Sequence, residues 1–364
     1  MGNIVHRTVF PSAANFQPAA AGPVRPTRER RSEPARARDG AVAAPIAAPT
    51  AARPTAYDDA GALIRRLKKP VRDLLKEVRL GRAVINDAVL PVVDEIHASL
   101  EEHPTAFITL ARIKAQNDRA VMHGLAVSAL MINLGREIGL DGGSLRDLGT
   151  AGLLHDIGET ALPATLLERP ARLSPPELAL VRSHTVRGHE HLAVSDGLPA
   201  VVRDVALHHH ERVDGNGYPV GTSGPALSQE ARIAAICDVY DAITSNRPHR
   251  EAWTPPESLA TMFAWSGHFD ETLLSHFVRS VGIYPVGSLV RLASDHLGVV
   301  LSQNDDLTKP VVRVFYSIAG RTKASRRDLD LSRENGDAIV SREMPRKWGF
   351  LDWDDQWPKL LRLA

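Results

Sequence analysis

The chain has 364 residues, a length that predicts two or three structural units. Its 44 Lys and Arg residues balance 43 Asp and Glu residues at a formal net charge of +1, so no overall field favours nucleic acid or a membrane surface as a partner. The single cysteine, Cys237, excludes an internal disulfide, and no apolar run approaches the roughly 20 residues of a membrane span, so we expect a cytoplasmic protein.

Residues 1–55 are rich in Pro, Ala and Arg and have almost no aromatic anchors. Such a segment cannot bury enough apolar surface to offset its ordering entropy, so it is predicted to be a disordered tail. Residues 56–117 carry apolar side chains at spacings of three and four, which predicts a small helical segment with a break at Pro70.

The helical pattern continues over residues 118–281, where the helix breaks are glycines and prolines. Ser174 followed by two prolines and Glu177 is typical of a helix start with an N-cap residue. After Gly282 the segments are short, rich in β-branched residues and separated by turn residues, so residues 282–364 are predicted to form a small β-rich extension. Three of the five tryptophans lie near its end and are expected to cover that sheet. The predicted fold class is therefore mainly α, with a helical bundle followed by a small β unit.

Eight of the fifteen histidines lie between positions 123 and 210. Histidines and aspartates alternate there at intervals long enough to place them on successive helices, and a helical bundle can bring such side chains to one interior point. Imidazole and carboxylate ligands without thiolates suit iron, manganese, nickel or zinc. The candidate ligands from this pattern are His155, Asp156, His184, His209, His210 and Asp238.

The pair His155 and Asp156 follows an apolar stretch, where a buried charged carboxylate is costly unless it is paired or bound to a metal. A site with two metals needs a bridging carboxylate, and Asp156 is the natural candidate. Adjacent residues diverge by about 100° on a helix, so His209 and His210 could reach different metals.

Two further segments extend this pattern. Residues 214–217 (DGNG) form a tight turn directly after the histidine pair, which predicts a rigid loop at the rim of the site. Asp241 shares a helix face with Asp238, and Arg247 and Arg250 repeat the same spacing. Two guanidinium groups near a metal cluster suit phosphate oxygens, although such arginines are also common on solvated faces.

Cys237 points away from Asp238 on a helix and is predicted to be an inert core thiol.

Four segments in this order and spacing resemble the HD-GYP family: LLHDIGE, SHTVRGHE, HHERVDGNGYP and DVYDAITSNRPHR. The resemblance runs from about Asn117 to Phe277. It implies the helical fold of HD domains and the activity of a metal-dependent cyclic di-GMP phosphodiesterase. In that family a metal-bridged hydroxide opens the substrate to the linear dinucleotide pGpG and, in some members, GMP.

Carried over by position, the resemblance implies the same six metal ligands and adds His123, a further ligand in some members. Members with three metals carry a glutamate at the position of Arg119, so the resemblance implies two metals here. Iron or manganese is favoured, with zinc, nickel and cobalt as the other candidates. It places His155, Asp156 and Asp241 in the catalytic set, and it assigns substrate contacts to Asp241, Arg247 and Arg250. The GYP loop, implied to contact GGDEF-type or other signalling proteins, is formed by Gly217, Tyr218 and Pro219.

Position 159 departs from the family, which has lysine where this chain has Glu159. This glutamate either leans toward the metals or pairs with an arginine such as Arg212. Three functions remain open from the sequence. The first is the phosphodiesterase, which the full ligand set favours. The second is a cyclic-dinucleotide receptor with weak or no catalysis, which Glu159 favours. The third is an HD hydrolase of another nucleotide phosphoester.

Overall fold

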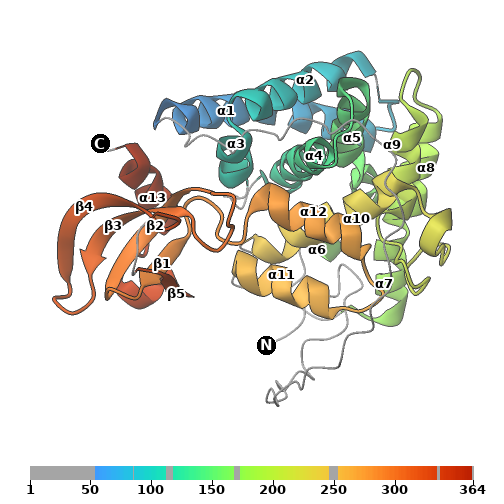
Figure 1. The fold of residues 1–364 in the computed structure, drawn as a ribbon. Coiled ribbons are helices and arrows are strands. Elements are labelled where there is room, and N and C mark those ends of the chain that lie inside the picture. The colour runs from blue at the N-terminus through green and yellow to red at the C-terminus, as the bar shows by residue number, and fades with distance from the viewer. Residues whose placement is uncertain are drawn as a thin grey trace, which may run out of the picture.

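The computed structural model describes residues 54–84, 86–111, 118–167, 173–245, 253–333 and 337–362. The predicted tail lies outside these residues, except that positions 54 and 55 already belong to the first helix. The described chain is mainly helical and ends in a five-stranded sheet, so the predicted fold class is confirmed (Figure 1). The helices are α1 (Pro54–Arg79), α2 (Asn86–Glu102), α3 (Pro104–Ala111), α4 (Arg119–Glu137), α5 (Gly142–Leu154), α6 (Ala164–Leu167), α7 (Pro175–Arg182), α8 (His184–Ala193), α9 (Ala200–His208), α10 (Gln229–Thr244), α11 (Pro255–Ala264), α12 (Glu271–Val281) and α13 (Trp353–Arg362).

Helix α1 runs through Pro70 without a break, so the predicted break is wrong. A proline inside a helix removes one backbone hydrogen bond and crowds the preceding turn. On either side of it, Leu67 and Val71 are 1% and 2% exposed, so tertiary packing holds the helix together across the proline. Local sequence alone underestimates this contribution, because most helix stability in proteins comes from burial of an apolar face.

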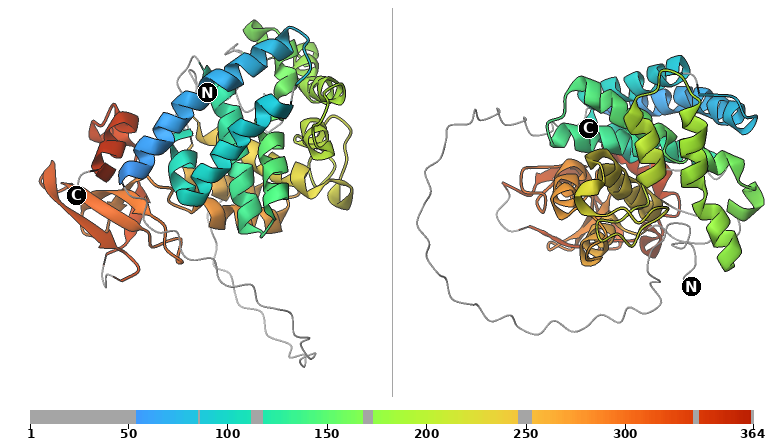
Figure 2. Two further views of the ribbon diagram at one scale, coloured as in Figure 1. Left: turned by 90° about the horizontal axis from the view of Figure 1, so that it is seen from above. Right: turned by 90° about the vertical axis from the view of Figure 1, so that its right-hand side faces the viewer.

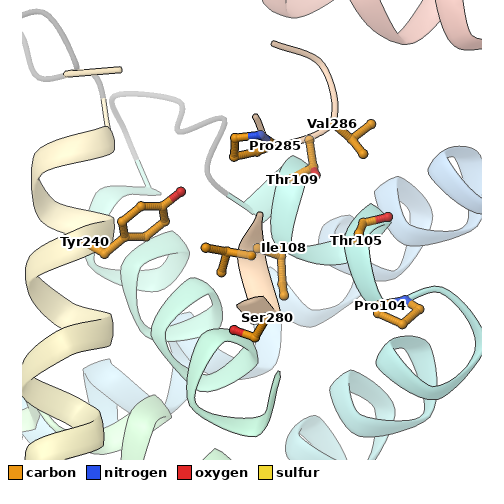
Figure 3. A pocket seen from close by; sticks show the side chains of 9 residues that line it. Pro104, Thr105, Ile108, Thr109, Tyr240, Ser280, Pro285 and Val286 are labelled. Carbon is orange, nitrogen blue, oxygen red and sulfur yellow. The ribbon is translucent and has the colours of Figure 1, made fainter. Parts of the chain in front are cut away.

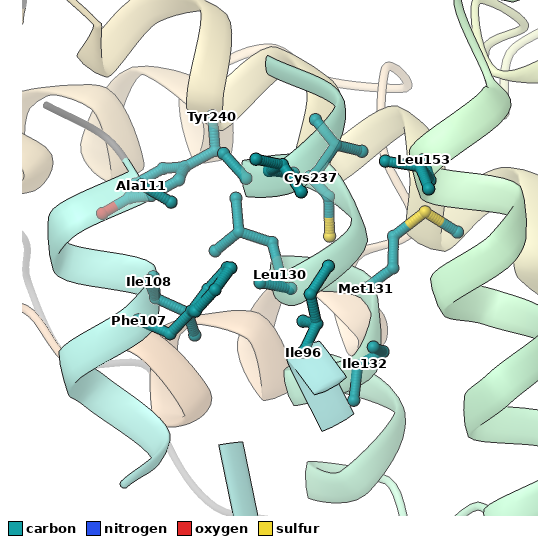
Figure 4. Close-up of a cluster of buried hydrophobic side chains, with 14 of the residues drawn as sticks. Ile96, Phe107, Ile108, Ala111, Leu130, Met131, Ile132, Leu153, Cys237 and Tyr240 are labelled. Carbon is teal, nitrogen blue, oxygen red and sulfur yellow. The ribbon is translucent and has the colours of Figure 1, made fainter. Parts of the chain in front are cut away.

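Helix α4 forms the centre of the bundle, and α3, α5, α10 and α12 pack around it. Nearly every residue from Val121 to Gly135 is buried, as expected for a helix that is apolar on all sides. Figure 4 shows this core, in which Leu130 of α4 lies near Phe107 of α3 and Cys237 of α10. Cys237 is fully buried, which confirms the prediction of a core thiol.

The sheet is antiparallel with strand order β4-β3-β2-β1-β5 and lies with α13 at one end of the helical body (Figures 1 and 2). One face, including Leu297 and Val299, joins the main core, and there Trp357 of α13 meets Tyr57 of α1 edge-on with ring centroids 5.7 Å apart. The other face carries a second small core around Val312. The strands are β1 (Leu289–Leu292), β2 (His296–Ser302), β3 (Val311–Ser317), β4 (Thr322–Asp330) and β5 (Ile339–Arg342).

A small hollow marks the seam between the helical body and the sheet (Figure 3). It is lined by α3, α10, the end of α12 and the segment that leads to β1, with Ile108, Tyr240 and Val286 among its walls. None of the side chains that line it carries a charge. The hollow is therefore a packing seam.

Candidate metal centre

The structure brings the histidines and aspartates of five helical segments to one point. Their ligating atoms form two groups, within each of which all atoms lie within 4.8 Å of one another. We call the first the α4 group, which consists of His123, His155 and Asp238, and the second the α8 group, which consists of Asp156, His184, His209 and His210. All seven residues implied as metal ligands by the sequence and the resemblance are thus placed together.

Asp156 lies between the two groups and presents one carboxylate oxygen to each. Its Oδ1 atom is 3.3 Å from Nε2 of His184 and 3.4 Å from Nε2 of His209. Its Oδ2 atom is 3.4 Å from Nε2 of His155 and 3.5 Å from Nε2 of His123. This is the arrangement required of a carboxylate that bridges two cations.

Three of the histidine rings are held by backbone carbonyls of their own helical turns. Because a carbonyl only accepts, each Nδ1 atom must carry the hydrogen, and the neutral ring then presents an unprotonated Nε2 to the centre. A hydrogen bond of this kind orients metal-binding histidines in general. The three Nδ1–H groups donate from His155 to Gly152 (2.8 Å), from His184 to Val181 (2.8 Å) and from His209 to Val205 (3.0 Å).

The protein side chains alone do not satisfy this cluster. The Nε2 atoms of His184 and His209 lie 3.3 Å apart, so two lone pairs face each other if both rings are neutral. The Nε2 atom of His155 and the Oδ2 atom of Asp238 are buried and have no hydrogen-bond partner among the described residues. A divalent cation in each group would bind these atoms, and the nitrogen and oxygen donors suit a first-row transition metal. The residues therefore fit a two-metal site.

The charges of the cluster confirm that Asp156 is its electrostatic centre. Burial opposes ionisation of Asp156, yet the charge of His155 and the close contacts with His123, His155 and His184 hold its pKa well below the usual range. Burial likewise disfavours protonation of His184, but the hydrogen bond and charge of Asp156 raise its pKa to about 9. For His210 burial dominates, followed by the charge of His209, so its pKa lies well below the usual value. Asp156 is thus an ionised carboxylate throughout the neutral range.

Asp241 lies against the ring of His123. Its Oδ2 atom lies 2.5 Å from Nδ1 of His123, and Asp241 is 0% exposed. On the other side of the ring, Nε2 of His123 is 3.1 Å from Oδ1 of Asp238. Asp241 therefore contacts the Nδ1 side of the His123 ring and is buried, and its role in substrate binding stays a prediction. The i, i+3 spacing on α10 places both aspartates at the same imidazole.

His209 and His210 lie together in the α8 group, although His210 Nδ1 is also 3.8 Å from Oδ2 of Asp238 in the α4 group. Helix α9 ends at His208, and the next two residues form a turn in which the angle of a regular helix no longer applies. Their ring centroids lie 4.1 Å apart. The end of the helix, which the sequence pattern does not locate to the residue, decides this geometry.

Gly158 allows the segment after Asp156 to approach α8. This glycine lies in a short 3-10 helix, η4 (Ile157–Ala161), and a Cβ atom added to it would overlap the backbone oxygen of His184. Only a glycine permits this contact. The contact brings Asp156 and His184 into the same group.

The GYP loop is braced from within by Glu211, a buried residue that the sequence analysis did not single out. Its Oε1 atom accepts hydrogen bonds from the backbone N–H groups of Val220 (2.7 Å) and Gly221 (2.9 Å). A Cβ atom on Gly217 would overlap the backbone of Glu211, so the loop closes tightly on this side chain. The position of Glu211, directly after the two histidines, is the one signal in the sequence that could have identified it.

Tyr218 connects this loop to the metal centre. Its ring stacks on that of His210 with centroids 4.8 Å apart and an interplanar angle of 28°. The peptide bond between Tyr218 and Pro219 is cis. The loop therefore lies against a metal-ligand candidate and forms one wall of the site.

Glu159 is half-buried and close enough to the centre to interact with the charges of Asp156 and His184. Burial and then the charge of Asp156 raise its pKa, while the charges of His184 and Arg119 lower it. Arg212, the arginine named as a possible partner of Glu159, pairs instead with Asp214 at 2.6 Å. Arg247 and Arg250 lie outside the described residues.

Fold and site together define a metal-dependent phosphohydrolase built on an HD-type helical bundle. The family model described as HD domain matches residues 97–273. A cyclic di-GMP phosphodiesterase of Pseudomonas aeruginosa is 43% identical over 305 residues, which cover 83% of this chain and 74% of that relative. The chain belongs to the HD-GYP family of HD domain proteins.

Other relatives match over shorter stretches. The cyclic di-GMP phosphodiesterase response regulator RpfG of Xanthomonas campestris is 39% identical over 39% of this chain and 38% of its own length. The 3'3'-cGAMP-specific phosphodiesterase 1 of Vibrio cholerae is 34% identical over 41% of this chain and 35% of its own length. A solved HDG"Y"P protein of Bdellovibrio bacteriovorus shares the fold with a TM-score of 0.51 at 20% identity, over 61% of this chain and 74% of that one. None of the described helices has the length and apolar character needed to cross a membrane.

Proposed function

We propose that this enzyme hydrolyses cyclic di-GMP to the linear dinucleotide pGpG, with GMP as the product of a second cleavage. The observation that carries the proposal is the carboxylate of Asp156 shared between two groups of nitrogen and oxygen ligands. The relatives named as cyclic di-GMP phosphodiesterases support the choice of substrate. The single cysteine supports a reducing compartment, the cytoplasm.

Two divalent cations held by these groups would supply a water nucleophile of lowered pKa and would stabilise the charge that develops on the phosphate. We propose iron or manganese, with zinc, nickel and cobalt as alternatives, because the ligands are imidazoles and carboxylates. The chain itself contributes orientation. The backbone carbonyls behind His155, His184 and His209 fix the ring nitrogens in place before substrate binds. Such preorganisation avoids the cost of arranging the ligands during the reaction.

Glu159 supports a second candidate, a cyclic-dinucleotide receptor with little catalysis. A glutamate close to the centre places a negative charge near the position of a substrate that carries two phosphodiester anions. A third candidate is hydrolysis of another cyclic dinucleotide, which the similarity to a 3'3'-cGAMP-specific phosphodiesterase supports.

One experiment separates these candidates. Purified protein loaded with iron or manganese is incubated with cyclic di-GMP, and in parallel with 3'3'-cGAMP, and the products are separated by chromatography. We expect pGpG from cyclic di-GMP at a higher rate than any product from 3'3'-cGAMP. Binding of cyclic di-GMP without turnover would support the receptor, and faster turnover of 3'3'-cGAMP would support the third candidate.

We further propose that the GYP loop contacts GGDEF-type or other signalling proteins. Val220, directly after Pro219, is 68% exposed although the loop around it is tightly braced. An exposed apolar side chain on a rigid loop suits a protein contact. The test is a pull-down of purified GGDEF domains by the native protein and by Val220→Asp, and loss of binding in the variant is expected.

A further inference from the structure

Arg182 lies beside the metal centre but is not one of its ligands. It is the last residue of α7, and His184 begins the next helix. Its guanidinium carbon lies 5.1 Å from the centroid of the Tyr218 ring. Because the same ring stacks on His210, Tyr218 forms a layer that links the arginine to the α8 group.

The guanidinium lacks an anionic partner among the described residues. No ion pair between Arg182 and a carboxylate is found among the described residues; the side chain is half-buried, and its Nε atom is fully buried without a hydrogen-bond partner. Arginine has five N–H donors and remains charged at any physiological pH. A buried charged donor left unsatisfied costs more than a neutral one, so an anionic ligand at this place would remove a penalty that the protein carries.

Support of the GYP loop does not by itself account for Arg182. The loop is already held by Glu211, which accepts from Val220 and Gly221. A residue needed only for packing against Tyr218 would not require a charge. An aromatic face does, however, hold a guanidinium in place by a cation–π contact. The N–H donors at the edge of the guanidinium then stay available for a phosphate.

We infer that Arg182 binds a second phosphate group of the substrate, the one that the metals do not engage. This inference rests on the proposed function, in which the substrate is a cyclic dinucleotide with two phosphodiester groups. The two ligand groups engage the phosphodiester that is cleaved. Arg182, one aromatic ring away from His210, recognises the other. Arg182 thereby selects substrates that carry two phosphates over simple phosphodiesters.

The test compares two substrates in the metal-loaded protein: cyclic di-GMP, with two phosphodiesters, and bis(p-nitrophenyl) phosphate, with one. The variant Arg182→Met keeps an apolar stem on Tyr218 but removes the charge. We expect its KM for cyclic di-GMP to rise about tenfold to a hundredfold, the range of a charge-assisted hydrogen bond. Its metal content and its kcat/KM for bis(p-nitrophenyl) phosphate should stay within about twofold of the native values.

Arg187→Met is the matched control, because Arg187 lies on α8 but is exposed, with its side chain donating to Ser183 at 3.0 Å. This variant should leave the KM for cyclic di-GMP and the kcat/KM for bis(p-nitrophenyl) phosphate unchanged. Arg182→Lys keeps a charge without the planar fork and should show a smaller rise in KM than the methionine variant. If Arg182→Met does not fold, the KM of Arg182→Lys for cyclic di-GMP tests the inference in its place.

Equal losses on both substrates, or a loss of metal, would show that Arg182 only supports the site and would overturn the inference. An unchanged KM for cyclic di-GMP would overturn it as well. If the native protein binds but does not cleave cyclic di-GMP, the proposed function fails by itself. Calorimetric affinities of the native protein and Arg182→Met for the dinucleotide then test the inference, and equal affinities would reject it.

Discussion

The two ligand groups are built in different ways. The α4 group projects from long, buried helices, with His123 on α4 and Asp238 on α10 surrounded by the main core. In the α8 group, His184 is the first residue of α8, and His209 and His210 follow the end of α9. The α4 group is thus positioned mainly by core packing, with one backbone hydrogen bond behind His155, whereas the α8 group depends on two such bonds, a glycine contact and the GYP loop. We therefore expect the α8 group to release its metal first.

Asp156→Asn should have the largest effect, because the carboxylate of Asp156 presents one oxygen to histidines of each group. The asparagine amide carries no charge and has only one oxygen, so it cannot offer an oxygen to each of two cations. We expect loss of both metals by elemental analysis and a fall in activity of about a thousandfold or more. Asp196→Asn, in an exposed position, is the control. Retention of two equivalents of metal by Asp156→Asn would refute the bridging role.

Gly158→Ala should damage the α8 group selectively. The added methyl group overlaps the backbone of His184, so η4 and α8 must move apart. Overpacking of this kind costs about 1–3 kcal/mol of stability. We expect elemental analysis to find one metal equivalent instead of two, and thermal unfolding to begin at a lower temperature. Gly142→Ala has open space around its Cβ position and should leave both quantities unchanged. A variant that loses the metals of both groups together would show that the groups are not independent.

Asp241→Asn should weaken the α4 group. The buried carboxylate orients the His123 ring from its Nδ1 side, and loss of such a contact typically reduces metal affinity or activity 10–100-fold. Competition with a chelator should show this loss for one metal equivalent and leave the other bound as tightly as before. If metal affinity is unchanged while KM rises, Asp241 contacts substrate and the geometric assignment is incorrect.

Glu159→Lys should have the smallest effect. The side chain interacts with the charges of Asp156 and His184, so a lysine there would attract the substrate phosphates where the glutamate repels them. Glu159 is half-buried, and interactions of partly exposed charges rarely exceed about 1 kcal/mol, so we expect kcat/KM for cyclic di-GMP to rise roughly fivefold with metal content unchanged. A collapse of activity together with metal loss would instead identify Glu159 as a ligand. No change would place it outside the reach of the substrate.

Much of this protein is determined by local sequence. The alternation of histidine and aspartate specifies the ligand chemistry, and the change of apolar period after Gly282 specifies where helices give way to strands. The pairing of His155 with Asp156 in an apolar stretch already indicates a buried charge that needs a cation. These features depend on residue type and on spacing within one element, which the sequence states directly.

Tertiary structure alone decided how the candidate metal ligands are distributed between the α4 group and the α8 group. The sequence does not show that α9 ends at His208, that Asp241 lies behind His123, or that Arg182 rests on Tyr218. It also does not show that burial carries α1 through Pro70. Each of these depends on where an element ends and on what packs against it from a distant part of the chain. Such contacts are set by the free energy of the whole packed core, to which a local pattern contributes only one part.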